Sequence, residues 1–169
     1  MSRVFVIGDS HFGHAGMVWF RNPDGSKVRP WDNVEQMDEA MIGAWNRVVT
    51  KRDKVIHLGD FVMNRRYLSV ADRLNGHKVL VMGNHDIFRA RDYLKHFDDL
   101  KGAVVRNGVI MTHLPIHPGS FGKRYTHNVH GHTHTSVVRN WYGMPDPRYK
   151  CVCVEQIDYQ PVLLDSLFD

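Results

Sequence analysis

The sequence predicts an α/β protein with a mixed β-sheet or a pair of sheets. In the first half of the chain, short apolar runs rich in β-branched residues alternate with segments of helical periodicity, and strands dominate the second half. Several of the apolar runs stop at a glycine that is followed by polar residues. With 169 residues, 43% of them hydrophobic, the chain is expected to form one domain (1–169) with a substantial core.

The first half of the chain supplies the predicted alternation. Asn33 and Gln36 resemble a capping box, and the apolar residues that follow recur at helical spacing, which predicts a helix over 34–49. A shorter helix ends at the turn signal Asn75-Gly76. The expected strands are 3–7, 54–58 and 78–82, and the expected shorter helices are 65–74 and 87–97.

The second half is predicted to consist mainly of strands and loops. Asn107-Gly108 is a favoured two-residue turn, which predicts a hairpin between 104–106 and 109–112. A loop rich in proline, glycine and basic residues follows over 114–126. The remaining extended segments are expected at 128–130, 136–140, 150–155 and 160–164.

Side chains able to bind metal follow five of these extended segments. All but His113 lie close to a glycine, which lets the backbone turn sharply and approach a ligand. Carboxylate, imidazole and amide groups without a thiolate suit Mn, Fe, Zn or Ni and keep Mg possible. An open site for one metal takes about three protein ligands, so this set fits two metals. The residues are Asp9, His11, Asp60, Asn84, His113, His132 and His134.

The order of these motifs strongly resembles that of the calcineurin-like metallophosphoesterase superfamily. The motifs stand here as Asp9-Ser10-His11, Gly59-Asp60, Gly83-Asn84-His85-Asp86, His113 and Gly131-His132-Thr133-His134. They span most of the chain, and the run from Asp9 to His14 looks like the small bacterial and phage-encoded members. The resemblance implies a four-layer α/β/β/α sandwich, with two mixed β-sheets face to face, flanking helices, and metals at the strand ends.

The resemblance also implies two divalent metal ions, with manganese first and iron, zinc, nickel or magnesium as alternatives. Asp60 is expected to bridge them. Two metals about 3.5–4 Å apart can lower the pKa of a bridging water and clamp the oxygens of a phosphate. The other ligands divide into Asp9, His11 and His134 for one metal, and Asn84, His113 and His132 for the other.

His85 and Asp86 are the expected catalytic residues. Direct attack by a metal-bridging hydroxide needs no covalent phospho-enzyme, but the leaving alkoxide of a diester needs a proton, which the imidazole of His85 can supply. Asp86 is the candidate to orient His85. In the protein-phosphatase branch a carboxylate three positions after the bridging aspartate does this, and Met63 stands at that place here. Protein-phosphatase activity is therefore not favoured.

Substrate contacts are expected from His14 and from the basic loop that follows His113. His117 and Arg124 are the candidates there, because a guanidinium pairs bidentately with phosphate and loops on rigid scaffolds often carry such contacts. The alternative is a solvated loop with scattered charge. His57, on an apolar strand, is expected to be structural.

The leading hypothesis is a dinuclear phosphodiesterase acting on a small nucleotide-like or phosphorylated substrate. A metal-dependent nuclease is the alternative, because a net charge of +4 permits nucleic-acid binding without favouring it. A phosphomonoesterase, a protein phosphatase or a non-catalytic scaffold is less favoured. Scaffolds of this fold have lost metal ligands or the substrate-facing histidine, and this chain retains both.

The sequence predicts a cytoplasmic protein and leaves its oligomeric state open, with a monomer as the default expectation. No apolar run approaches the roughly 20 residues that span a bilayer, and the N-terminal apolar run meets Asp9 without a signal-peptide cleavage site. Cys151 and Cys153 are expected to be small core hydrophobes rather than a pair of soft-metal ligands.

Overall fold

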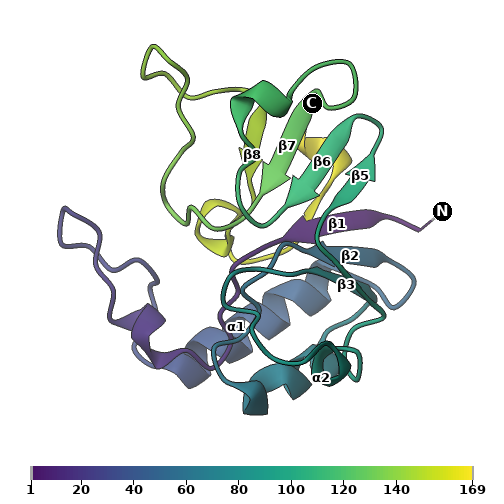
Figure 1. The fold of residues 1–169 in the computed structure, drawn as a ribbon. Helices are drawn as coiled ribbons and strands as arrows, with labels where there is room; N and C mark the ends of the chain where they lie inside the picture. The colour runs from purple at the N-terminus through teal and green to yellow at the C-terminus, as the bar shows by residue number, and fades with distance from the viewer. Residues whose placement is uncertain (1, 169) are drawn as a thin grey trace.

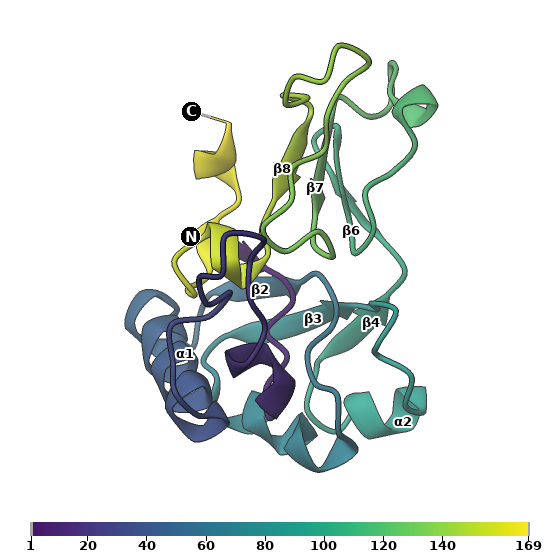
Figure 2. The same cartoon turned by 90° about the vertical axis from the view of Figure 1, so that its left-hand side faces the viewer.

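The computed structural model describes residues 2–168 and contains two mixed β-sheets packed face to face (Figures 1 and 2). The first sheet has five strands in the order β4-β3-β2-β1-β9. Its strands run parallel except β9, which pairs antiparallel with β1. The bounds are β1 (Val4–Ile7), β2 (Lys54–His57), β3 (His77–Val81), β4 (Asp99–Lys101) and β9 (Val162–Leu163).

The second sheet has four strands in the order β5-β6-β7-β8. The antiparallel pair β5–β6 is the predicted hairpin, and positive φ values at Asn107 (49°) and Gly108 (79°) match the turn that joins such strands. β7 and β8 continue the sheet in parallel. The bounds are β5 (Val104–Arg106), β6 (Val109–Thr112), β7 (His127–His130) and β8 (Tyr149–Cys151).

The two sheets meet along an apolar layer. Because side chains alternate across a strand, each of these strands gives one set of residues to this interface and the other set to its outer face. The buried side chains of the interface are Val6, Ile56, Leu58, Val81, Val109, Met111, Val129, Val152 and Leu164.

Helices cover the outer face of the first sheet. α1 (Val34–Val48) begins at Asn33, whose side chain accepts the N–H of Gln36, and it buries Trp45 in the same cluster as Phe5 and Leu80. The 3₁₀ segment η2 (Arg65–Arg73) and the short α2 (Ala90–Tyr93) continue this layer. None of the helices in residues 2–168 combines the length and the apolar character that a bilayer crossing requires.

The outer face of the second sheet carries only a thin layer. Tyr149 of β8 packs edge-on against Phe121, which directly follows the 3₁₀ turn η3 (Pro118–Ser120). The predicted α/β class with two mixed sheets is confirmed, with a loop and a single 3₁₀ turn in the place of the fourth layer. Three other 3₁₀ turns are η1 (Ala15–Val18), η4 (Val154–Gln156) and η5 (Asp165–Leu167).

Several predicted elements differ from the structure. The expected helix 87–97 is reduced to Ala90–Tyr93, because the chain must then turn to form β4, a strand that was not predicted. The expected helix 65–74 is 3₁₀ rather than α. The expected strand 136–140 is one arm of a projecting loop with a single bridge between Arg139 and Pro145, and the expected strand 150–155 ends at Cys151.

We expect Met111→Ala to lower the free energy of unfolding by about 2–5 kcal/mol, because its fully buried side chain fills the layer between the sheets. Denaturant unfolding measures this change. Val105→Ala, at an exposed position on neighbouring β5, is the control and should change stability by less than about 0.5 kcal/mol. Equal effects of the two substitutions would contradict the packing described here.

Candidate metal centre

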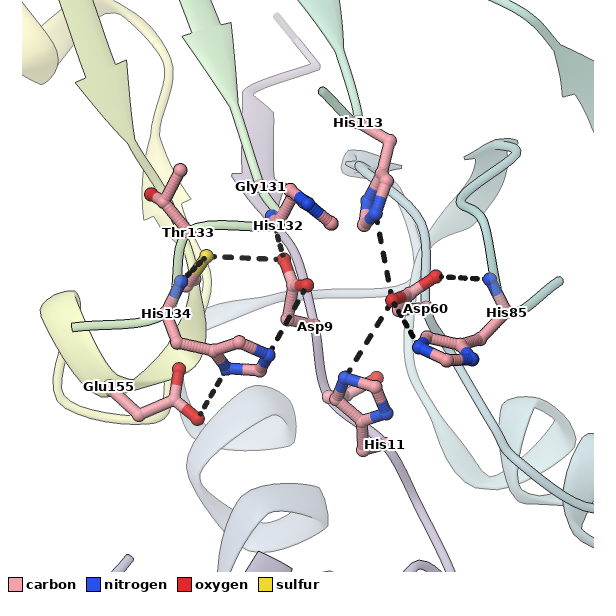
Figure 3. Close-up of polar contacts among 12 residues, drawn as sticks. Asp9, His11, Asp60, His85, His113, Gly131, His132, Thr133, His134 and Glu155 are labelled. Atoms are coloured by element: carbon pink, nitrogen blue, oxygen red, sulfur yellow. Dashed lines mark hydrogen bonds and ion pairs between the residues drawn. The ribbon is translucent and has the colours of Figure 1, made fainter. Parts of the chain in front are cut away.

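The predicted ligand residues all lie where strands of the two sheets end, and Figure 3 labels all of them except Asn84. Asp9 and His11 follow β1, and two backbone hydrogen bonds tie this segment to the end of β2: Asp9 N–H to Gly59 O (2.9 Å) and His11 N–H to Asp60 O (3.0 Å). Asn84 follows β3, His113 follows β6, and His132 and His134 follow β7. The face-to-face packing of the sheets therefore gathers these loops at one edge.

The side chains form two clusters with Asp60 between them. In each cluster, the candidate ligand atoms lie within 4.8 Å of one another. Asp60 Oδ2 lies 3.8 Å from His11 Nε2 in one cluster and 3.5 Å from His113 Nε2 in the other. Asn84 Oδ1 lies 2.8 Å from His113 Nε2, so the amide adjoins the second cluster. The clusters are Asp9, His11 and His134, and Asp60, His113 and His132.

Most of these residues have a left-handed backbone. The φ angles are 57° at Asp9, 50° at His11, 55° at Asp60, 67° at His132 and 47° at His134. Such angles are rare outside glycine, and residues held in sparsely populated backbone regions concentrate at functional sites. These angles turn the chain sharply directly after the strand ends.

Glycines make room for the two carboxylates. A Cβ atom at Gly83 would overlap Asp60 Oδ1, and one at Gly131 would overlap Asp9 Oδ2. At Gly59, where φ is 87°, a Cβ would lie 2.6 Å from the Gly83 Cα. These positions therefore require glycine for close approach, as the sequence pattern indicated.

Several buried polar atoms of the first cluster lack a partner. Among the described residues, none forms a hydrogen bond with Asp9 Oδ1 or with either ring nitrogen of His11, although both side chains are buried. Burial raises the pKa of Asp9 to about 6 and holds the pKa of His11 well below its usual range. Buried polar groups are normally paired, and a cation between these atoms would satisfy both residues. The donor set therefore fits a metal ion.

Neighbouring groups orient two of the histidines. His113 Nδ1 lies 2.7 Å from Leu58 O, an arrangement in which Nδ1–H donates and Nε2 keeps its lone pair for the cluster. His134 Nδ1 lies 3.1 Å from Glu155 Oε1, and Figure 3 shows its Nε2 directed toward Asp9. Outer carboxylates and carbonyls commonly fix metal-binding histidines in this way.

Three residues that no sequence motif marks surround the first cluster. Arg29 is fully buried, donates to the carbonyl oxygens of Asp9 (2.6 Å) and Ser10 (2.7 Å), and pairs with Glu155 at 2.8 Å. Cys153 Sγ lies 3.2 Å from Asp9 Oδ2, so this cysteine supports the site rather than only filling the core. Arg29 lies in an irregular segment, and only its contacts in the fold reveal its role.

His85 and Asp86 have separate environments. The backbone N–H of His85 donates to Asp60 Oδ1 (2.9 Å), while its side chain is 46% exposed with Nε2 4.0 Å from Asp60 Oδ2. The buried Asp86 carboxylate accepts the N–H groups of Asp60 (2.7 Å), Gly83 (2.8 Å) and Phe61 (3.2 Å). The expected pairing of Asp86 with His85 is therefore replaced by a role in holding the two loops, because both carboxylate oxygens are used by backbone donors.

Of the three expected substrate contacts, only His14 lies at the centre, with its ring centroid 5.6 Å from that of His11. His117 accepts the N–H of Gly119 (3.1 Å) and caps η3. Arg124 lies over the ring of Tyr125. This segment leads into the start of β7, whereas the clusters lie at the end of that strand, and the contact of Arg124 with substrate stays a prediction.

His57 matches its expected structural role. It is fully buried, its Nε2 lies 2.8 Å from Ser10 Oγ, and burial lowers its pKa to about 3. A neutral imidazole in this position holds the side chain of Ser10, the residue between Asp9 and His11.

Two mixed sheets with carboxylate and imidazole clusters at their strand ends define a metallophosphoesterase fold. Residues 2–160 match the calcineurin-like phosphoesterase family, and the chain belongs to that family. The uncharacterized protein MJ1445 of Methanocaldococcus jannaschii is 32% identical over 178 residues, covering 99% of this chain and 90% of the relative.

Two solved structures share the fold. One is the protein of unknown function AQ665 from Aquifex aeolicus, with a TM-score of 0.68 and 23% identity, covering 99% of this chain and 98% of that chain. The other is the Pseudomonas putida nuclease MPE, with a TM-score of 0.50 and 20% identity, covering 85% of this chain and 66% of that chain. At these identities the likeness extends to the fold alone.

Gly131→Ala is expected to lower the free energy of unfolding by about 1–3 kcal/mol, because the added methyl group overlaps a buried carboxylate oxygen of Asp9. Gly43→Ala is the matched control, since a Cβ at this position in α1 meets no atom within 4 Å. The control should raise stability by about 0.5–1 kcal/mol, as alanine is the better helix former. Denaturant unfolding measures whether the free energy of unfolding falls for Gly131→Ala and rises for Gly43→Ala. A rise for Gly131→Ala would contradict the close approach of Gly131 to the Asp9 carboxylate.

Proposed function

We propose that this protein is a two-metal phosphoesterase that hydrolyses phosphate diesters. One observation carries the proposal: Asp60 lies between two clusters of candidate ligands, with one oxygen facing a histidine of each. A single carboxylate shared by two sets of ligands is the arrangement that a bridged pair of divalent cations needs. Membership of the calcineurin-like phosphoesterase family supports the same reaction class.

The proposed ligands form two sets joined by Asp60. Their oxygen and imidazole donors suit manganese, with iron, zinc, nickel and magnesium as alternatives. When bound, the two metals supply a water of lowered pKa as nucleophile and positive charge for the phosphate oxygens. The unpaired buried atoms of Asp9 and His11 support the first set, made with His134, while His113, His132 and Asn84 would complete the second.

His85 is the proposed proton donor to the leaving group. Its half-exposed imidazole can reach a bound ester, and its backbone is fixed by the hydrogen bond to Asp60. Asp86 acts as a positioning residue through the backbone of Gly83 and Asp60. His14, next to His11, is placed to bind a phosphate oxygen.

A diester is favoured over a phosphoprotein as substrate. The exposed Met63 occupies the place where the protein-phosphatase branch has an orienting carboxylate. A nuclease, which is a diesterase for polynucleotides, is the second candidate, favoured by the exposed aromatic side chains of Trp141 and Tyr142 on the loop that follows His134.

Removal of metal by a chelator should abolish hydrolysis of an aryl phosphodiester, and addition of Mn²⁺ should restore it. Asp60→Asn should lower kcat/KM by at least about 100-fold, because the bridging charge is lost. His77→Ala, at an exposed histidine on the opposite end of β3, is the control and should leave turnover unchanged. If the protein binds two manganese ions but hydrolyses neither the diester nor its monoester, the proposal that it is a phosphoesterase is wrong.

His85→Ala should lower turnover by about 10²–10⁴-fold for a diester with an alkoxide leaving group. The loss should be much smaller for a p-nitrophenolate leaving group, which departs without a proton. Steady-state kinetics on the two substrates measure the difference, with His96→Ala, at a histidine paired with Asp72 on the surface, as the control. An equal loss on both substrates would exclude His85 as the proton donor.

A further inference from the structure

We propose that two projecting loops beside the metal centre form a binding site for single-stranded nucleic acid, with exposed aromatic side chains as stacking platforms. The inference rests on the proposed phosphodiesterase function and names its substrate class. Each loop leaves directly from a residue of the centre, and Figure 1 shows both projecting from the same side of the molecule. The loops are 14–28 and 135–147.

The second of these loops is a narrow hairpin with an aromatic tip. A bridge between Arg139 and Pro145 and a 2.8 Å hydrogen bond from Asn140 N–H to Met144 O close it. At the tip, Trp141 is 99% exposed and Tyr142 is 89% exposed. Side chains of this size are usually packed against the protein, so their full exposure at the end of an ordered turn indicates a ligand surface.

A groove of about 600 Å³ lies beside this tip. Its walls combine the rings of Trp141 and Tyr142 with the polar groups of Arg139, His117 and Arg148. Arg148 is paired with Asp146 (2.6 Å). Arg139 instead donates to the carbonyl oxygen of Gly143 (2.7 Å), and within residues 2–168 no carboxylate pairs with it. The groove therefore carries a positive charge that no carboxylate of the described residues compensates. His117 lines this groove and belongs to neither ligand cluster.

The first loop repeats this combination of exposed aromatic rings and arginine. Trp19 is 67% exposed and Phe20 is 50% exposed. Arg21 follows them and donates to backbone carbonyl groups, including that of Trp19 (2.9 Å). The ring of Phe20 stands edge-on to His14, with centroids 6.0 Å apart, and His14 in turn adjoins the ligand residue His11. This platform therefore begins at the metal centre itself.

The combination favours nucleic acid over an apolar partner. In both loops, an adjacent pair of exposed aromatic residues is flanked by arginine and asparagine, as Arg21-Asn22 after the first pair and Arg139-Asn140 before the second. Rings with nearby cations are how sequence-tolerant sites bind the bases and the backbone of a single strand. The groove at Trp141 shares no residue with either ligand cluster, so a molecule that occupies both must extend past the metal centre. A net charge of +4 permits the binding of such a polyanion.

Fluorescence anisotropy with labelled single-stranded DNA and RNA 12-mers tests binding, using metal-stripped protein so that hydrolysis cannot interfere. The double substitution Trp141→Ala and Tyr142→Ala should weaken binding by about tenfold or more, since each stacked base contributes to affinity. The control is Leu94→Ala with Val105→Ala, which removes exposed apolar side chains elsewhere. Comparison of the affinities for the DNA 12-mer and the RNA 12-mer shows which nucleic acid the protein prefers.

Salt dependence tests the contribution of charge. Arg139→Gln should reduce the slope of log affinity against log salt concentration by about 0.7, the value for one phosphate contact on a single strand. Arg52→Gln removes the same charge from an exposed turn before β2 and should leave the slope unchanged. Equal slopes for wild type and Arg139→Gln would exclude this contact.

Activity separates this inference from the proposed function. The double aromatic variant should keep its kcat/KM on a small aryl diester and lose at least about tenfold on an oligonucleotide. If the protein hydrolyses no diester, the proposed phosphodiesterase function is wrong. The anisotropy experiment would still measure binding to the proposed surface in that case. If the double substitution leaves oligonucleotide binding unchanged, the proposed binding surface is wrong and the proposed phosphodiesterase function is unaffected. Self-association that the same substitutions abolish, without oligonucleotide binding, would assign the loops to a second copy of the chain.

Discussion

The burial of two carboxylates at the meeting edge of two sheets is the constraint on which this structure depends. Asp9 Oδ2 accepts the N–H of His132 (2.8 Å), and Asp60 Oδ1 accepts the N–H of His85 (2.9 Å), so each carboxylate joins loops from different strands. Burying a charged group is costly unless it is paired, and hydrogen bonds from neutral backbone groups compensate only in part. The neighbouring glycines leave room for these carboxylates, and the left-handed backbone at Asp9 and Asp60 turns the chain at the strand ends. Both features position the buried carboxylates rather than the hydrophobic core.

Local pattern was sufficient to predict the strand ends, because each motif except His113 combines an apolar strand with a glycine and a polar residue within a few positions. A local pattern cannot indicate contacts between residues that lie far apart in the sequence. Arg29 and Glu155 are 126 positions apart, and their pairing depends on an irregular segment reaching η4. No periodicity or motif can indicate such a contact, although it supports the backbone of Asp9 and the ring of His134.

The errors in the predicted elements also have physical causes. Val137 and Val138 resemble the start of a strand, but the side chain of Asn140 accepts the N–H groups of Tyr142 and Met144 and closes a turn instead. Residues 87–97 have helical character, yet β4 must start only two residues after Phe97, which leaves room for one helical turn around the buried Tyr93. In both cases a local hydrogen bond or a neighbouring strand overrides the propensity of the segment.

Asp60 also determines where the proposed proton donor stands. One of its oxygens lies between His11 and His113, and the other holds the backbone of His85. No other carboxylate among the described residues pairs with the His85 ring, which lies in the opening of the site. The placement of His85 therefore depends on the same side chain that joins the two clusters, so any change that moves Asp60 is expected to alter the proposed ligand sets and the proposed proton donor together. The carboxylate of Asp86 contributes to this arrangement by fixing the backbone of Asp60, Phe61 and Gly83.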